Sequence, residues 1–244
     1  MADEGILVTG MVLNTMPMGE FDKRISILTK ELGKVSVFVR GAKSPKSTLG
    51  AASDPFVMGE FFVAEGRGGS YSLYRANIKD YFSSIREDYD MVCYGSYFLE
   101  VADYYGRGMV DGKDTLNLLY VTLKAMERKN IPLPLVRCIY ELKTLCINGE
   151  APDVFSCAGC AKTEKTMYLN IKKSRVFCEN CKGKGDDIFL DDKTLYAMRF
   201  VEKAPLNNLY SFSLGEDCIR AFSDIMKKYY GYHVSRNFKS LEFI

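Results

Sequence analysis

The sequence contains one histidine, His233, so no second histidine is present to complete a metal-binding pair. A lone histidine near a C-terminus is more often a packing residue than a catalytic base. The sequence also lacks a P-loop and a G-x-S-x-G nucleophile elbow. The adjacent carboxylates Asp191 and Asp192 fall where a helix should begin, which indicates a helix cap. These absences predict a binding protein and not an enzyme.

No apolar run reaches the length of a transmembrane helix, so no membrane association is expected. Asp3 and Glu4 stand where a secretory signal would carry positive charge, so no export signal is predicted. In a protein that is not exported, closely spaced cysteines bind metal more often than they form disulfides. The formal net charge of +2 says little about partners, so the local distribution of charge matters more.

Short strands and turns dominate the first eighty residues. Strands are expected near residues 6–8, 24–29, 35–40, 56–64 and 71–79, which together predict a small barrel or sandwich. Helical spacing of apolar residues follows over 89–105, 116–126, from Pro134 to Gly149, and over 195–201. Ser213 and Glu216 suggest a capping box for a last helix that ends at Gly231.

Four of the eight cysteines form two Cys-x-x-Cys pairs, Cys157 with Cys160 and Cys178 with Cys181. Each pair can direct two thiolates at one ion, and the seventeen residues between the pairs suffice for a hairpin. Four thiolates fill a tetrahedral Zn²⁺ site and leave no open position, so the spacing predicts one structural zinc ion per chain. Redox chemistry and cysteines without metal are the alternatives.

Positive charge surrounds the second cysteine pair. Six basic residues are opposed by Glu179 alone, namely Lys165, Lys172, Lys173, Arg175, Lys182 and Lys184. A Zn²⁺ ion with four thiolates contributes −2, which leaves the segment at about +3. Such a surface can contact nucleic acid or can simply face solvent, and the solvated interpretation is the commoner one.

A second concentration of positive charge lies between residues 23 and 46. Seven basic residues are opposed by Glu31 alone, namely Lys23, Arg24, Lys30, Lys34, Arg40, Lys43 and Lys46. The rest of residues 1–80 holds three basic and eight acidic residues, so the imbalance is local.

Strand alternation separates this segment into two faces. Val35, Val37 and Val39 are expected to face a barrel core, and the alternate residues Lys34, Ser36, Phe38 and Arg40 to face outward. Cations beside an exposed aromatic suit single-stranded nucleic acid, because the cations follow phosphates and the ring stacks on a base. A solubilising face with Phe38 packed under a neighbouring segment remains the alternative.

The chain resembles the RecO family of bacterial DNA-repair proteins, which are recombination mediators. The likeness covers nearly the whole length and rests on VLNTMPMGEFDKRISILTKELGKVSVFVRGAKSPKS, followed by the DPF of residues 54–56. It continues with YELKTLCINGEAPDVFSCAGC, FCENC and the tail FKSLEFI. Many relatives have a glycine pair shortly before the second cysteine pair, whereas this chain has KKSRVFCENC. The sequence therefore leaves the conformation of that hairpin undetermined.

The resemblance implies an α+β protein of several parts. These are an N-terminal five-stranded OB-fold barrel over 1–80, a mainly α-helical domain over 81–155 and 186–244, and an inserted four-cysteine zinc module over 156–185. It implies binding of single- and double-stranded DNA, annealing of strands coated by the single-strand-binding protein SSB, and cooperation with RecR in loading RecA at gaps. A cytoplasmic, nucleoid-associated protein without catalytic activity is expected.

Carried over position by position, the resemblance places DNA contacts on Lys34, Arg40, Lys43 and Lys46, with Lys23 and Arg24 nearby, and strand alternation adds Phe38. Three other functions compete with this interpretation. An OB-fold and zinc-ribbon protein could bind RNA or one promoter sequence, a scaffold could bind proteins only, and a Cys-x-x-Cys pair could serve a thiol oxidoreductase.

Overall fold

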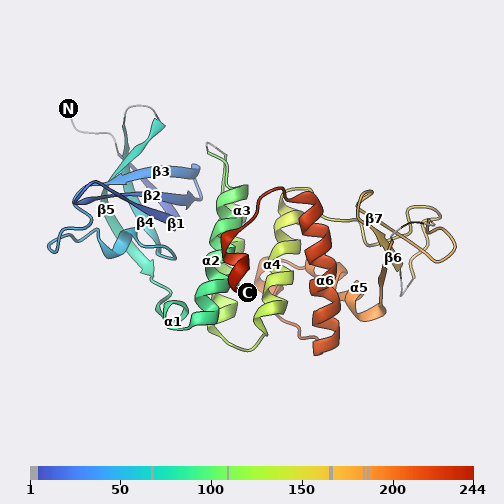
Figure 1. Cartoon of the computed structure of the whole chain (residues 1–244). Coiled ribbons are helices and arrows are strands. Elements are labelled where there is room, and N and C mark those ends of the chain that lie inside the picture. The colour runs from blue at the N-terminus through green and yellow to red at the C-terminus, as the bar shows by residue number, and fades with distance from the viewer. Residues whose placement is uncertain (1–4, 67–68, 109, 165–166, 184, 186) are drawn as a thin grey trace. The chain divides into compact units, whose positions relative to one another are not determined.

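The computed structural model describes residues 5–66, 69–108, 110–164, 167–183, 185 and 187–244 (Figure 1). The chain divides into two compact units, Met1–Leu123 with Phe238–Ile244, and Lys124–Asn237. These units do not follow the predicted boundaries at residues 80, 155 and 185. The predicted division into barrel, helical domain and inserted zinc module stays a proposal about separately folding parts.

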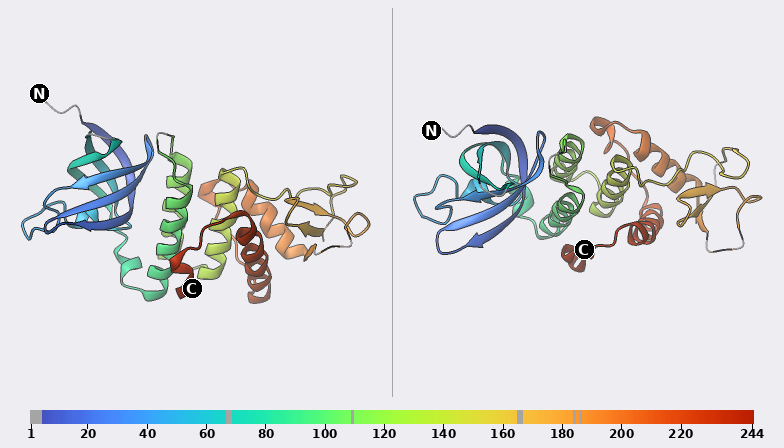
Figure 2. Two further views of the ribbon diagram at one scale, coloured as in Figure 1. Left: turned by 45° about the horizontal axis from the view of Figure 1, so that its top comes forward. Right: turned by 90° about the horizontal axis from the view of Figure 1, so that it is seen from above.

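The first unit is built around a closed five-stranded barrel. Its strands are β1 (Ile6–Met18), β2 (Asp22–Thr29), β3 (Gly33–Val39), β4 (Met58–Glu65) and β5 (Tyr71–Asp80). The order around the barrel is β1-β2-β3-β5-β4, and only the contact between β3 and β5 is parallel (Figures 1 and 2). A five-stranded barrel of this kind is an OB-fold, as predicted.

The barrel core comes from the inward residues of each strand. Val35, Val37 and Val39 are at most 7% exposed, which confirms the predicted valine face of β3. A bulge between Val12 and Asn14 lets the long strand β1 bend, so that it pairs with both β2 and β4 and closes the barrel. The predicted fourth strand begins later than expected, since Phe56 has a positive φ of 71° and β4 starts at Met58.

Helix α2 (Tyr89–Tyr105) covers one end of the outer surface of the barrel. It follows the short α1 (Ser83–Arg86) and packs against β1 and β2. There, Met11 and Leu28 lie opposite one another and are both buried, although their side chains point out of the barrel. The backbone N–H of Lys34 donates to the Arg107 carbonyl at 2.9 Å, so the segment after α2 crosses the start of β3.

The tight turn at Gly33 depends on this packing. Gly33 has a φ of +63°, and a Cβ there would collide with the carbonyl oxygens of Arg107 and Val110. Gly41 has a similar φ of +60°, but no atom lies within 4 Å of its Cβ position. The two glycines therefore share a backbone conformation and differ only in their surroundings.

We expect Gly33→Ala to lower the free energy of unfolding by about 3 kcal/mol, because strain and collision add. Gly41→Ala should cost only about 1 kcal/mol, the price of the left-handed conformation. Chemical denaturation of both variants measures the difference. Equal losses of the free energy of unfolding in the two variants would mean that the segment after α2 does not contact Gly33.

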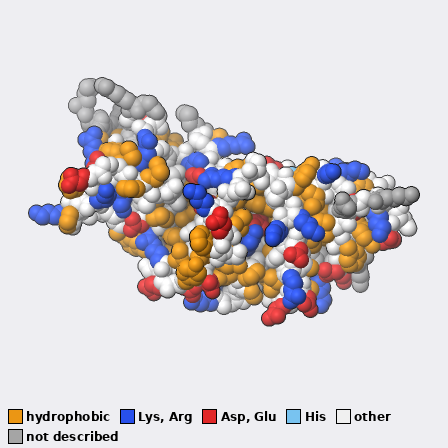
Figure 3. Space-filling view, in the orientation of Figure 1, with side chains coloured by type: hydrophobic (Ala, Val, Ile, Leu, Met, Phe, Trp, Pro, Cys, Tyr) orange, Lys and Arg blue, Asp and Glu red, His pale blue; other side chains and the backbone are white. Residues whose placement is uncertain are grey.

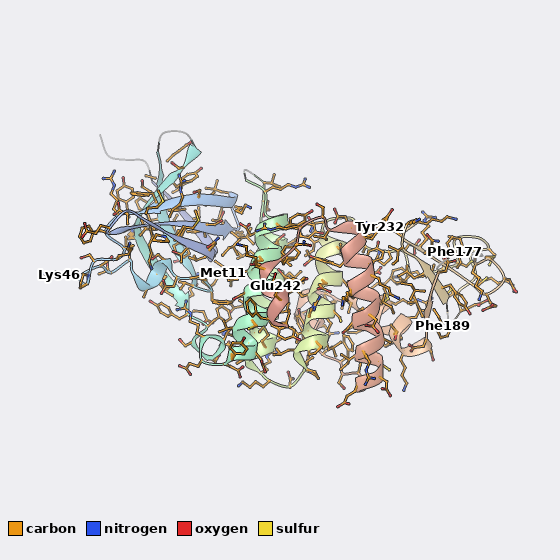
Figure 4. The ribbon with its side chains drawn as sticks, viewed as in Figure 1. Met11, Lys46, Phe177, Phe189, Tyr232 and Glu242 are labelled. Carbon is orange, nitrogen blue, oxygen red and sulfur yellow. The ribbon has the colours of Figure 1, made fainter. Side chains whose placement is uncertain are left out.

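The C-terminal segment completes the first unit. Phe238 packs edge-on against Tyr97 with ring centroids 5.5 Å apart, and the short helix η4 (Lys239–Phe243) lies along α2. Figure 4 labels Glu242 in this segment. Helix α3 (Lys113–Glu127) begins in the first unit, and the division between the units falls within it.

The second unit packs three helices beside a small sheet. Helix α4 (Leu133–Ile147) packs against α5 (Asp192–Lys203) and α6 (Glu216–His233). The sheet has the order β7-β6-β8, with β6 (Met167–Asn170), β7 (Arg175–Phe177) and β8 (Ile188–Leu190). Strand β8 is absent from the sequence-based prediction.

The ends of α5 and α6 differ in how they agree with the caps predicted from the sequence. Asp191 caps α5 as expected, because its side chain accepts hydrogen bonds from the N–H groups of Lys193 and Thr194. The predicted capping box is wrong, since Gly215 precedes α6 and no side chain caps it. Gly231 does not end α6, which continues to His233 with no left-handed residue there. Within the described parts of the chain, every helix is too short or too polar to cross a membrane.

Candidate metal centre and nucleic-acid interface

The two Cys-x-x-Cys turns bring four thiols to one point, as predicted. The Sγ atoms of Cys157, Cys160, Cys178 and Cys181 all lie within 4.8 Å of one another. Those of Cys160 and Cys178 are 3.7 Å apart. A tetrahedral ion with Zn–S bonds of about 2.3 Å holds its sulfurs about 3.8 Å apart. The cluster therefore has the size that a closed four-thiolate zinc site requires.

Local structure explains how the turns approach each other. The predicted hairpin between the pairs is formed by β6 and β7, which are antiparallel. A Cβ at Gly159 would lie 2.9 Å from the Cβ of Cys181, so glycine permits the close approach. The missing glycine pair does not prevent the hairpin, because Ser174 takes the left-handed conformation at its turn with a φ of 51°. His233 contacts the Ser174 hydroxyl at 3.2 Å and stacks near Tyr229, as a packing residue would.

Backbone groups prepare this cluster for a cation. Burial raises the pKa of Cys157, but the N–H groups of Cys178, Cys160 and Gly159 outweigh it and bring that pKa down to about 6. Hydrogen bonds with the thiols of Cys178, Cys160 and Cys157 raise the pKa of Cys181 to about 12. One sulfur thus ionises readily, whereas ionisation of all four requires a bound positive ion.

Two of the predicted DNA-contact residues on the barrel already have acidic partners. The Nζ atom of Lys23 lies 2.8 Å from an Asp54 carboxylate oxygen, and its side chain is 18% exposed. The Nζ atom of Lys34 lies 3.2 Å from the Asp103 carboxylate on α2. Because each ammonium is paired, Lys23 and Lys34 add less to the attraction of an anion than sequence alone suggests.

The other predicted residues lie at the end of the barrel surface opposite the end that α2 covers, called here the uncovered end. Cross-strand pairing places Arg24 opposite both Met16 and Phe38, and Phe38 opposite Ser72, so these side chains form a row over β1, β2, β3 and β5. Arg24 and Arg40 are exposed, and Phe38 is half-buried. Within the described residues, neither arginine forms an ion pair.

The loop after β3 is held against the turn between β1 and β2. The backbone N–H of Lys43 donates to the Phe21 carbonyl at 2.8 Å, and its Nζ donates to the Gly19 carbonyl at 2.9 Å. The Gly41 N–H donates to the Asp22 carboxylate at 2.8 Å. Lys46 is exposed and projects away from the barrel (Figure 4). The loop therefore presents Lys43 and Lys46 in an ordered conformation.

Phe21 is a further candidate that the sequence analysis missed. It lies at the turn between β1 and β2, and it is 54% exposed beside the loop after β3. A large aromatic residue in a short polar turn was the available signal. Figure 3 shows basic side chains around the barrel with hydrophobic ones between them.

The basic segment around the second cysteine pair lies on the small sheet of the second unit. Lys172, Lys173 and Arg175 are exposed, and Lys182 is half-buried. Lys165 and Lys184 fall outside the described residues.

Comparison with known proteins gives matches that together cover nearly the whole chain. Two family models match, "Recombination protein O N terminal" over residues 4–82 and "Recombination protein O C terminal" over 86–242. The DNA repair protein RecO of Alkaliphilus metalliredigens is 27% identical over 240 residues, covering 97% of each chain. That of Bacillus subtilis is 28% identical over 238 residues, covering 96% of this chain and 92% of the relative. That of Bacillus pumilus is 30% identical over 174 residues, covering 70% and 66%.

Proposed function

Since the chain belongs to the RecO family of DNA-repair proteins, and so has a role in DNA repair and recombination, we propose that it binds DNA through its barrel. The proposed ligands are single- and double-stranded DNA. The observation that carries the proposal is the uncovered end of the barrel surface, where exposed cations, which form no ion pair within the described residues, lie around the half-buried Phe38.

Four basic residues of this end are exposed, namely Arg24, Arg40, Lys43 and Lys46. Of the acidic residues beside it, Asp22 accepts the Gly41 N–H and Asp54 is paired with Lys23, while Glu20 is exposed in the turn between β1 and β2. Binding of cations to phosphates releases counterions and depends little on sequence. Phe38 and Phe21 offer ring surfaces on which bases of any kind can stack. The surface therefore suits a single strand of any sequence.

We propose strand annealing as the outcome of this binding. Two complementary strands repel one another through their phosphates, and a basic surface that holds them lowers this repulsion. Base pairing then supplies the specificity, so the protein needs no nucleotide hydrolysis and no catalytic residue. We place the protein in the cytoplasm, near the nucleoid. Its substrates there would be DNA strands coated by SSB. RecR would be the partner with which RecA is loaded at gaps.

The four-cysteine cluster has a structural role in this proposal. A Zn²⁺ ion bound by Cys157, Cys160, Cys178 and Cys181 would leave no coordination position for a substrate. Its free energy of binding would stabilise the surrounding segment, because the small sheet has too little hydrophobic core to fold without the metal.

An annealing assay tests the proposed function directly. Complementary oligonucleotides coated with SSB are mixed with the protein at a series of salt concentrations, and duplex formation is followed by fluorescence transfer. We expect annealing at low salt and a steep decrease as salt rises, because phosphate contacts dominate. The absence of annealing at every salt concentration would contradict the proposal, and a preference for RNA strands would favour the RNA-binding alternative.

A further inference from the structure

The small sheet of the second unit carries a row of three aromatic side chains across its strands. Tyr168 on β6 lies directly opposite Phe177 on β7 and directly opposite Phe189 on β8. Directly opposite residues share one face of a sheet, so the three rings form a ladder. The rings of Tyr168 and Phe189 have centroids 5.5 Å apart. Figure 4 labels the two ends of the ladder, Phe177 and Phe189.

This face is the outer face of the sheet. The alternate residues Met167, Leu169, Val176 and Leu190 point the other way and are fully buried. Phe189 in contrast is 54% exposed, and Tyr168 and Phe177 are half-buried. A sheet this small gains stability from its buried face, so the apolar rings on the other face need another explanation.

Basic side chains lie on the rings of this ladder. The Nζ atom of Lys182 is 3.8 Å from the centroid of the Tyr168 ring, and that of Lys173 is 5.2 Å from the centroid of Phe177. Arg175 lies two residues before Phe177 on the same face and is exposed. Two neighbouring acids are already engaged. Glu179 pairs with Lys182 at 2.7 Å, and Asp187 accepts a hydrogen bond from Asn170 at 2.6 Å.

We propose that this ladder is a second site for single-stranded DNA, separate from the barrel. Bases would stack on Phe189 and Phe177 at its two ends, and phosphates would lie beside the exposed Lys173 and Arg175, since Lys182 is already paired with Glu179. RNA-recognition domains bind single strands in a comparable way, on aromatic residues that project from a sheet. A surface for a protein partner would favour apolar residues with few lysines, since lysine is depleted in protein interfaces.

The inference rests on the proposed binding of DNA and extends it. Annealing requires that two strands be held by one protein, and a site on each compact unit would supply two holding surfaces. The cysteine cluster would also fix the position of the ladder. Cys178 follows Phe177 directly, and Cys181 precedes Lys182, so the metal ligands position the ladder and one of its cations.

The absence of tryptophan makes a direct test possible. Phe189→Trp places a single tryptophan in the ladder, Phe21→Trp places one on the barrel, and Tyr196→Trp places one on α5, where the tyrosine is 68% exposed. Each full-length variant is titrated with an unlabelled dT oligonucleotide, and its tryptophan emission is recorded. A base that stacks on the indole quenches its emission.

We expect quenching at positions 189 and 21, and none at position 196. Quenching at position 21 but not at 189 would overturn the ladder and leave the proposed function intact. Quenching at no position would contradict both proposals. Quenching at position 189 by a U oligoribonucleotide but not by dT would overturn the assignment to DNA. Capture of a protein by the ladder with no quenching would equally overturn it.

Loss of the ring should weaken binding at the ladder. In a chain whose barrel cations are replaced, Phe189→Ala should reduce affinity for the dT oligonucleotide about fivefold or more, as expected for one lost stacked base. Tyr196→Ala is the matched control, because Tyr196 is also an exposed aromatic residue and lies outside the ladder. Equal affinities of the two variants would mean that Phe189 does not stack on a base.

Discussion

Cys178→Ser is expected to remove the metal from the chain and to unfold the segment that the two cysteine turns enclose. Cys178 is 1% exposed, and its backbone N–H donates to the Cys157 sulfur at 3.3 Å, so it is both a ligand and part of the frame of the site. Structural zinc sites contribute about 10–16 kcal/mol to folding in small metal-dependent domains. Loss of one thiolate should therefore reduce zinc from about one ion per chain to nearly none.

Metal analysis of the purified protein measures this effect, and limited proteolysis reports on the segment between the turns. Cys218→Ser provides the matched control, since Cys218 lies on α6, is partly exposed and belongs to no cluster among the described residues. The control should retain its zinc and its resistance to protease. Wild-type protein without zinc, or with the paired cysteines in disulfides, would contradict the structural site and favour the thiol oxidoreductase.

Replacing four exposed cations at the uncovered end of the barrel by glutamate is expected to have the second large effect. The residues are Arg24, Arg40, Lys43 and Lys46, all exposed at the uncovered end of the barrel. For single strands, each lost phosphate contact lowers the slope of log affinity against log salt by about 0.7, so four contacts account for a decrease of about 3. Affinity should fall most at low salt, where electrostatic attraction is strongest.

Fluorescence anisotropy of a labelled dT oligonucleotide over a salt series gives affinity and slope together. Lys30→Glu is the matched control, because Lys30 is an exposed lysine of the same barrel at the end of β2 that α2 covers. It should leave the slope unchanged. A fourfold variant with the slope of the wild type would show that these cations do not contact phosphates. A melting temperature close to that of the wild type would establish that the barrel is still folded.

The paired lysines of the barrel show where sequence reasoning reached its limit. Lys23 and Lys34 lie in the same basic segment as the exposed residues, and their sequence context does not distinguish them. Their partners are Asp54 and Asp103, 31 and 69 residues further along the chain. No local pattern reveals such a partner, because ion pairs depend on which segments fold together.

The sequence by itself determined the barrel core and the four-cysteine cluster. Strand alternation and Cys-x-x-Cys spacing act over a few residues, so Val35, Val37 and Val39 had to share a face and each cysteine pair had to form one turn. Only the tertiary structure decided which basic residues remain unpaired, which end of the barrel α2 covers, and that β8 joins β6. That last pairing sets Phe189 beside Tyr168, because strands distant in sequence meet only when the whole unit packs.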